Sequence, residues 1–309
     1  MHIVRYLDRN GPQVGLLDAD SGTITGFAGI STLGELLRLG AAELRERCAH
    51  PDGAAVSAET VRLLAPIDGR TELWAAGVTY EQSRSARVEE SERSATVYEQ
   101  IYDAERPELF FKSVAWKVVG DGEPISVRDD SQVDVPEPEL AIVANAAGEI
   151  VGYTVCDDVS SRTIEGENPL YLPQAKVFLG AAALGPGIRP AWEIDDPYQL
   201  EIALEIIRGG GTVWSGKANT SQLHRRLDDL VGYLRHADMF PDGVILSTGT
   251  CLVPEMPFTL SHGDTVEITI EKVGRLRTPV VQGLSAAADA LAARDDRVSN
   301  SDVQDGAKS

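Results

Sequence analysis

Two glutamates separated by one residue stand at the start of an apolar run, VPEPELAIV at residues 135–143. Residues two apart on a β-strand project from the same face, so we expect Glu137 and Glu139 to point together. Adjacent carboxylates repel each other, and a bound cation relieves that repulsion. Glu-x-Glu pairs also occur on solvated strand faces, so this pair by itself does not establish a metal site.

A second strand follows and ends in two aspartates. Turn residues at 145–148 and an apolar run at 150–158 predict a β-hairpin that closes on Asp157 and Asp158. Folding the hairpin about residue 147 places residue 157 opposite residue 137, at the end that carries the glutamates. A slip of one residue exchanges the two aspartates on that face, so both remain candidates. Three converging carboxylates, without sulfur or imidazole, suit Mg²⁺, Mn²⁺ or Ca²⁺.

The stretches around these carboxylates resemble the core signature of the fumarylacetoacetate hydrolase family, over roughly residues 73 to 282. They are PEPEL (136–140), GYTVCDDVSSR (152–162), QAK (174–176), LGP (184–186), STGT (247–250) and LSHGDTV (260–266). The resemblance implies that Glu137, Glu139 and Asp158 bind Mg²⁺ or a similar ion. Where the family usually has Asn before this Asp, the chain has Asp157, which leaves the hydrogen bonding around the ligands open.

The same resemblance bears on the type of reaction. The hydrolytic members that the chain resembles carry a histidine on a lid, and this histidine pairs with a glutamate to activate water. The matching segment at residues 77–83 has Ser83 in the histidine position, and the sequence has no histidine between His50 and His224. A His–Glu pair is therefore hard to build here. Hydrolysis of a C–C bond in an acylpyruvate-type substrate by a glutamate base alone remains an alternative.

Residues 102–112 and 164–176 resemble the 2-keto-3-deoxy-sugar-acid dehydratases of the family. This resemblance implies loss of water from a 2-keto-3-deoxypentonate to give 2-oxoglutarate semialdehyde. A 2-keto acid can chelate a metal ion through its carboxylate and keto oxygens, and the ion stabilises the enolate formed when a C3 proton leaves. A base must take that proton and an acid must protonate the departing C4 hydroxyl. The candidates are Glu108 and Lys176, in either order.

Further residues could bind the substrate. Thr250 and the backbone of Gly249 could hold its carboxylate, and Arg84 or Arg87 could close over it from a lid. Each candidate also has a simpler interpretation: the lysine as a salt-bridge partner, the first glutamate as a strand start, and the arginines as solvated residues of a charged helix. A sugar-acid-binding module without turnover also stays open, as does decarboxylation or tautomerisation through the same enolate.

The elements that must position these residues predict an α+β chain. Hairpin and helix patterns predict a small N-terminal domain over residues 1–68. Short strands with glycine-rich turns predict a β-rich, metal-binding core over residues 69–295, which the resemblance implies is a β-roll in a homodimer. The expected helical segments lie at about 80–105 (the lid), 220–239 and 286–293, followed by a flexible tail at 296–309.

The composition narrows the classes of partner. A formal net charge of −20 over 309 residues argues against nucleic acid and against anionic membrane surfaces. A solvated surface accounts for most of this acidity, and a metal-binding cluster accounts for a few carboxylates. No run of 18 apolar residues and no apolar stretch after Met1 occur, so we expect neither a membrane span nor a secretory signal. Three scattered cysteines indicate a reducing cytoplasm.

Overall fold

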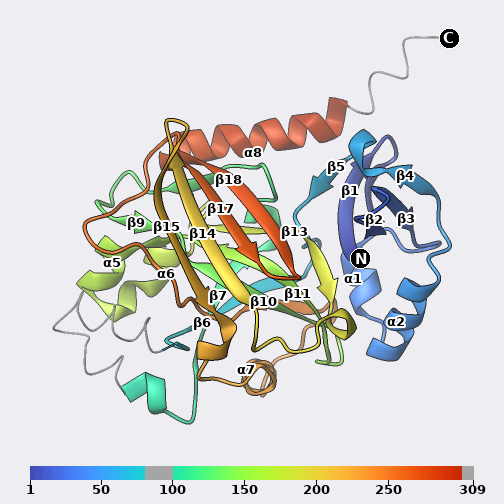
Figure 1. Ribbon diagram of the computed structural model, residues 1–309, viewed down its shortest axis with the longest axis horizontal. Helices are drawn as coiled ribbons and strands as arrows, with labels where there is room; N and C mark the ends of the chain where they lie inside the picture. Colours follow the sequence, from blue (N-terminus) through green and yellow to red (C-terminus); the bar gives the residue numbers. More distant parts are fainter. Residues whose placement is uncertain (81–99, 301–309) are drawn as a thin grey trace.

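The structure is a computed structural model that describes residues 1–80 and 100–300, without the side chains of residues 295–300. The fold is α+β and rich in strands, as expected, with two large β-sheets and a long C-terminal helix across one end (Figure 1). Among the described residues, no helix is both long and apolar enough to cross a membrane.

The N-terminal unit is a small antiparallel sheet with two helices. Its strands β1 (His2–Asp8), β2 (Gly11–Asp18), β3 (Thr23–Gly26) and β4 (Ala55–Ser57) pair in chain order, and β5 (Arg62–Leu64) pairs with β1. The helices α1 (Leu33–Leu37) and α2 (Ala41–Ala49) confirm the expected helical patterns. Because β1 also pairs with β13 (Ala182–Pro190), this unit extends the sheet of the core.

The core sheet continues through strands that are far apart in the sequence. Its order from β13 is β11 (Ile150–Asp158), β10 (Pro138–Ala144), β16 (Val244–Ser247), β6 (Glu72–Gly77) and β7 (Glu108–Val114). Strand β10 is buried on both faces, which explains its unbroken apolar sequence. Leu140 and Ile142 pack into one hydrophobic cluster, and Ala141 and Val143 pack into another.

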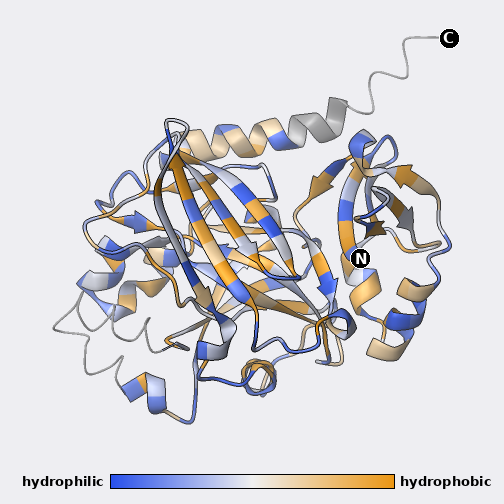
Figure 2. Cartoon of the chain, viewed as in Figure 1, coloured by the Kyte–Doolittle hydropathy of each residue, from blue (hydrophilic) through white to orange (hydrophobic). Residues whose placement is uncertain are grey.

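A second sheet covers one face of the first. Its order is β15 (Gly211–Asn219), β14 (Glu201–Arg208), β17 (Thr265–Ile270), β18 (Gly274–Gln282) and β8 (Ile125–Val127). Buried residues alternate with more exposed ones along β14. Figure 2, which colours the chain by hydropathy, shows hydrophobic residues along this strand. The inward residues Leu204 and Ile206 pack into the same cluster as Leu140.

Smaller elements complete the chain near the carboxylates. Strands β9 (Asp134–Val135) and β12 (Ser160–Ser161) pair with each other, and α5 (Arg162–Glu167) and α6 (Leu172–Lys176) follow. The 3₁₀ helices are η1 (Ala58–Thr60), η2 (Ala115–Lys117), η3 (Pro169–Tyr171), η4 (Ala191–Glu193) and η5 (Thr220–Gln222).

Two expected helices differ in length from the structure. The helix predicted over residues 220–239 is present but shorter, because α7 spans only Leu227–Leu234. Leu223 instead pairs with Tyr80, and His224 N–H donates to Thr79 O at 2.9 Å, so this stretch is extended. The last helix, α8 (Gly283–Asn300), is longer than the predicted 286–293 and includes the first residues of the expected tail.

Candidate metal centre and active site

The hairpin of β10 and β11 brings Asp158 beside the two glutamates. Pro138 lies opposite Asp157, one residue away from the register that we predicted by folding about residue 147. The difference arises from a β-bulge next to the turn, where the register shifts between Val143 and Ala144. Asp158 N–H donates to Glu137 O at 3.0 Å, so this aspartate, rather than its neighbour, reaches the glutamate face.

Glu137, Glu139 and Asp158 form a compact carboxylate triad. Each offers an oxygen that lies within 4.8 Å of the other two. All three side chains are buried, with exposed fractions of 2% or less. They line a small cavity of about 10 Å³, comparable to the space that one water molecule or ion occupies. The candidates that the sequence suggested as metal ligands therefore lie together in the structure.

Glu139 is oriented by two donors from the segment after β16. Its Oε2 accepts hydrogen bonds from Ser247 Oγ at 2.5 Å and from Gly249 N–H at 2.8 Å. Gly249 has a φ of +91°, and a Cβ there would lie 2.0 Å from Thr79 Oγ1. Only glycine fits this position without displacing a neighbour. Ser247 lies in a stretch that carried the family resemblance, but the sequence analysis gave it no role.

Lys176 lies among the carboxylates rather than at the surface. Its Nζ donates to Glu137 Oε2 at 2.8 Å, to Asp158 Oδ2 at 3.1 Å and to Ser160 Oγ at 2.6 Å. The same nitrogen lies 5.8 Å from the centre of the Phe110 ring. Lys176 is thus a salt-bridge partner, as the simpler interpretation expected, and these contacts also place its amine directly at the triad.

Two more cations adjoin the triad, and the sequence analysis did not give them a role in the reaction. The fully buried Lys112 pairs with Asp158 Oδ1 at 2.5 Å and also donates to the carbonyl oxygens of Val159 and Lys176. Arg162 lies 3.3 Å from Glu137 and forms an ion pair with it. Lys112 belongs to a stretch that resembled the dehydratases, but nothing in its spacing indicated a buried lysine.

Burial and mutual repulsion oppose ionisation within this cluster. The pKa of Glu139 is raised well above its usual value, first by burial and then by the charges of Asp158 and Glu137. Burial likewise raises the pKa of Asp157 to about 8, although a hydrogen bond from the Glu137 backbone opposes that rise. A carboxyl with this raised pKa favours its uncharged form, which resembles the Asn that the family usually has at this position.

The residues present fit a hard divalent cation. Three carboxylates supply an all-oxygen donor set, and the cavity between them has the volume of a single ion. A cation would relieve the repulsion that raises the pKa of Glu139. The donor set contains no sulfur or imidazole, which softer metals prefer.

Glu108 lies beside this cavity and opposite a glycine. It begins β7, where it forms a cross-strand pair with Gly77 of β6. The Glu108 carboxylate occupies the space above Gly77, because a Cβ on that glycine would lie 2.0 Å from Glu108 Oε2. Gly77 itself lines the carboxylate cavity. The sequence analysis proposed Glu108 and missed the glycine that makes room for it.

The expected substrate contacts differ in how far the structure places them. Gly249 and Thr250 both line the cavity. However, the Gly249 N–H is used by Glu139, and Thr250 Oγ1 donates to Pro138 O at 3.0 Å. Gly249 thus supports a metal ligand directly, whereas Thr250 supports the backbone between the two glutamates. Contact with a substrate carboxylate stays a prediction for both residues. Arg84 and Arg87, like most of the expected lid at about 80–105, lie outside the described residues.

Comparisons with known proteins agree with this geometry. The family model described as "Fumarylacetoacetate (FAA) hydrolase C-terminal" matches residues 73–281. A 2-dehydro-3-deoxy-D-arabinonate dehydratase of Saccharolobus solfataricus is 46% identical over 223 residues, which are 71% of this chain and 74% of that protein. A Haloferax volcanii protein named as a probable 2-keto-3-deoxyxylonate dehydratase is 46% identical over 263 residues, which are 82% of this chain and 89% of that protein.

A solved structure is similar over nearly the whole chain. It is a 2-keto-3-deoxy-D-arabinonate dehydratase complexed with magnesium and 2,5-dioxopentanoate, with a TM-score of 0.79 and 37% identity. The match covers 91% of this chain and 99% of the other. The family match over most of the core, together with these relatives, shows that the chain belongs to the fumarylacetoacetate hydrolase family.

Proposed function

We propose that the chain is a Mg²⁺-dependent hydro-lyase that removes one water molecule from a 2-keto-3-deoxypentonate and yields 2-oxoglutarate semialdehyde. The observation that carries the proposal is the buried triad of Glu137, Glu139 and Asp158 with Lys176 among its oxygens. The names of the two relatives support the reaction, and 2,5-dioxopentanoate, bound in the similar structure, is the same compound as the expected product.

Glu137, Glu139 and Asp158 are the residues that would hold the metal ion. When bound there, Mg²⁺ supplies a Lewis acid for the carboxylate and keto oxygens of a 2-keto acid. The magnesium in the similar structure supports this choice of metal. Ser247 and Gly249 keep Glu139 oriented, and Lys112 does the same for Asp158, so the ligands are held in place before a cation arrives.

Glu108 is the residue that we assign as the base for the C3 proton of the substrate. Its carboxylate lies over Gly77, at the wall of the cavity that the triad lines. It is only partly buried, whereas the triad carboxylates are almost inaccessible. A base must reach its proton within hydrogen-bond distance, and a carboxylate that packs against a glycine of the cavity wall fits that requirement.

Lys176 is the residue that we assign as the proton donor to the departing C4 hydroxyl. Its contacts with Glu137 and Asp158 favour the ammonium form, which carries the proton to be donated. Ser160 Oγ accepts a further hydrogen bond from Nζ and fixes its direction. The amine therefore lies beside the metal ligands, where the oxygen atoms of a bound 2-keto acid would gather.

The stoichiometry of the proposed reaction is simple. The substrate loses a proton from C3 and a hydroxide from C4, which leave together as water and create a C3=C4 double bond. The resulting allylic alcohol then isomerises by proton transfer, so that C5 becomes an aldehyde. The net change is the loss of one water molecule, with no oxidant or reductant required.

Three further properties belong to the same proposal. We expect a homodimer, following the family resemblance, and light scattering of the purified chain would test it. We expect a cytoplasmic location, which the three free and buried cysteines support. We retain Gly249, Thr250, Arg84 and Arg87 as residues that bind the substrate, in addition to the contacts that the first two make within the protein.

A mass-spectrometric assay tests the proposed reaction. The purified chain with Mg²⁺ is offered 2-keto-3-deoxy-D-arabinonate, 2-keto-3-deoxy-D-xylonate and an acylpyruvate, each with and without a chelator. We expect metal-dependent loss of one water from a deoxypentonate. Cleavage of the acylpyruvate into two acids would make the protein a hydrolase that works without a lid histidine. No change in any substrate would favour a binding module and would overturn the proposal.

A further inference from the structure

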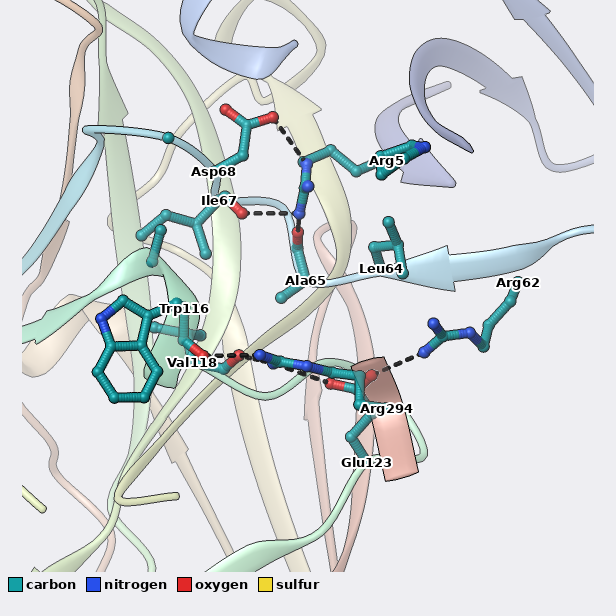
Figure 3. A pocket seen from close by; sticks show the side chains of 13 residues that line it. Arg5, Arg62, Leu64, Ala65, Ile67, Asp68, Trp116, Val118, Glu123 and Arg294 are labelled. Carbon is teal, nitrogen blue, oxygen red and sulfur yellow. Dashed lines mark hydrogen bonds and ion pairs between the residues drawn. The ribbon is translucent and has the colours of Figure 1, made fainter. Parts of the chain in front are cut away.

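A second cavity lies where the N-terminal unit, the core and the last helix meet. Its volume is about 280 Å³, and its walls come from β1, β5, residues 65–69, η2 and α8 (Figure 3). Among the described residues, none lines both this cavity and the cavity at the carboxylate triad. It is therefore separate from the proposed active site and needs its own explanation.

Three arginines reach this cavity from three parts of the chain. Arg5 comes from β1, Arg62 from β5 and Arg294 from α8, as Figure 3 shows. Two carboxylates, Asp68 and Glu123, also line it. The formal balance is thus three positive charges against two negative, in a chain whose net charge is −20. A local positive excess in an acidic protein favours a negatively charged ligand.

The carboxylates of the cavity already have donors. Asp68 accepts from the backbone N–H groups of Leu33 and Gly34 and pairs with Arg5 at 2.8 Å. Glu123 pairs with Arg62 at 2.9 Å and accepts from Gly120 N–H at 2.8 Å. A bound cation would have to compete with these contacts, so the wall offers little to a positive ligand.

One donor on the wall lacks an acceptor. The Nη1 atom of Arg62 donates to Glu123, but its buried Nη2 atom has no hydrogen-bond partner among the described residues. A buried guanidinium nitrogen without an acceptor is unfavourable, and the Arg62 side chain, which is 27% exposed, can turn this nitrogen toward an oxyanion in the cavity. The unmet hydrogen bond therefore points to a ligand that accepts hydrogen bonds, in agreement with the charge balance.

The rest of the wall is apolar. Leu64, Ile67, Ala115 and Val118 line it, and Trp116 lies at its edge with 57% of its surface exposed. A large exposed indole beside arginines offers a surface on which a flat or apolar body can pack. A cavity of about 280 Å³ limits the ligand to a small molecule.

We propose that this cavity binds a small organic anion, with a carboxylate or phosphate group at Arg62 and an apolar body against Trp116. A ligand there would contact the N-terminal unit, the core and α8 at once. It would therefore stabilise the docking of α8, because Arg294 already ties this helix to the carbonyl oxygens of Trp116 and Val118. The proposal does not depend on the reaction at the carboxylate triad.

Binding to the full chain, with a chelator present to keep acids away from the triad, tests the proposal. The probes are phenyl phosphate, benzoate, inorganic phosphate and, as a neutral control, benzyl alcohol. Calorimetry and tryptophan fluorescence measure binding, and the melting temperature reports stabilisation. We expect saturable binding of at least one aromatic anion with a Kd near or below about 1 mM, and no saturable binding of the alcohol. The comparison of benzoate with phenyl phosphate identifies the preferred anionic group.

Matched variants locate the site. Arg62→Gln should weaken binding at least about tenfold, whereas Arg47→Gln, which removes another paired arginine of the N-terminal unit, should leave it unchanged. Trp116→Ala should weaken the aromatic anions more than inorganic phosphate, and it keeps the test valid if Arg62→Gln fails to fold. The proposal is overturned if none of the anions saturates, or if binding is the same in wild type and in both cavity variants.

Discussion

Gly77→Ala should slow catalysis while leaving metal binding intact. Gly77 does not have a positive φ, so alanine fits its backbone. The added Cβ would lie 2.0 Å from Glu108 Oε2, and the nearest comfortable approach is about 3.4 Å. The carboxylate must therefore move by more than about 1 Å. A displacement of that size at a catalytic group can cost about 100-fold in rate, or about 2.7 kcal/mol of transition-state stabilisation.

The stability of the variant should change little, because the displaced atom ends a flexible side chain and alanine restricts the unfolded chain more than glycine does. Turnover of 2-keto-3-deoxypentonate would be measured together with Mg²⁺ affinity by calorimetry. Gly211→Ala, at the start of the exposed strand β15, is the matched control, because its Cβ would meet nothing closer than 4.0 Å. Unchanged kcat in Gly77→Ala would refute a role for Glu108 in proton transfer, and an equal loss of metal affinity would place Glu108 at the metal instead.

Three further predictions concern the metal and the stability of the fold. Gly249→Ala should weaken Mg²⁺ binding about 10- to 100-fold in calorimetry, because it displaces the backbone N–H that donates to Glu139. Adding Thr79→Ala to this variant should restore part of the Mg²⁺ affinity, because it removes the side-chain oxygen that the new Cβ would meet. If Gly249→Ala binds Mg²⁺ like wild type, that hydrogen bond does not position the ligand. Mg²⁺ at about one hundred times its Kd should stabilise the chain by about 2.7 kcal/mol, seen as a higher melting temperature that a chelator reverses; no shift would argue against metal binding. Asp242→Asn should lower stability at pH 7 by about 1 kcal/mol after allowance for solvent screening, because hydrogen bonds from Arg70 and a second arginine lower the pKa of Asp242 to about 2. That contribution is present above the unfolded pKa near 3.9 and is lost as the pH falls through about 2. The free energies of unfolding of wild type and Asp242→Asn, measured by urea titration, should therefore converge in acid. A difference in unfolding free energy that stays constant with pH would contradict the assignment.

The carboxylates were predictable from the sequence because strand periodicity is a local property. Glu137 and Glu139 were expected to share a face, and their carboxylates do meet, although β10 begins only at Pro138 and Glu137 precedes it. The hairpin returned an aspartate to them. The choice between Asp157 and Asp158 came from the family resemblance. The strand pattern could not make that choice, because a β-bulge that was not predictable from the sequence shifts the register by one residue.

The rest of the site depends on contacts between distant segments. Lys112 reaches Asp158 across 46 residues of sequence, since β7 and the end of β11 meet only in the folded chain. Gly77 matters because Glu108 lies opposite it, a pairing that becomes visible only with the strand order of the core sheet. The extended stretch before α7 was missed for the same reason, because its partners are Thr79 and Tyr80.

The most direct test of the central claim is the turnover of 2-keto-3-deoxypentonate at rising Mg²⁺ concentration, in wild type and in Glu139→Gln. We predict that aldehyde formation in wild type saturates with Mg²⁺ at a half-maximal concentration that matches the calorimetric Kd, and that a chelator abolishes it. Glu139→Gln should fold normally but require at least about 100-fold more Mg²⁺, because it removes one charged ligand from the triad. Turnover that persists in wild type after complete chelation, or that is unaffected in Glu139→Gln, would contradict a metal-dependent dehydration at this site.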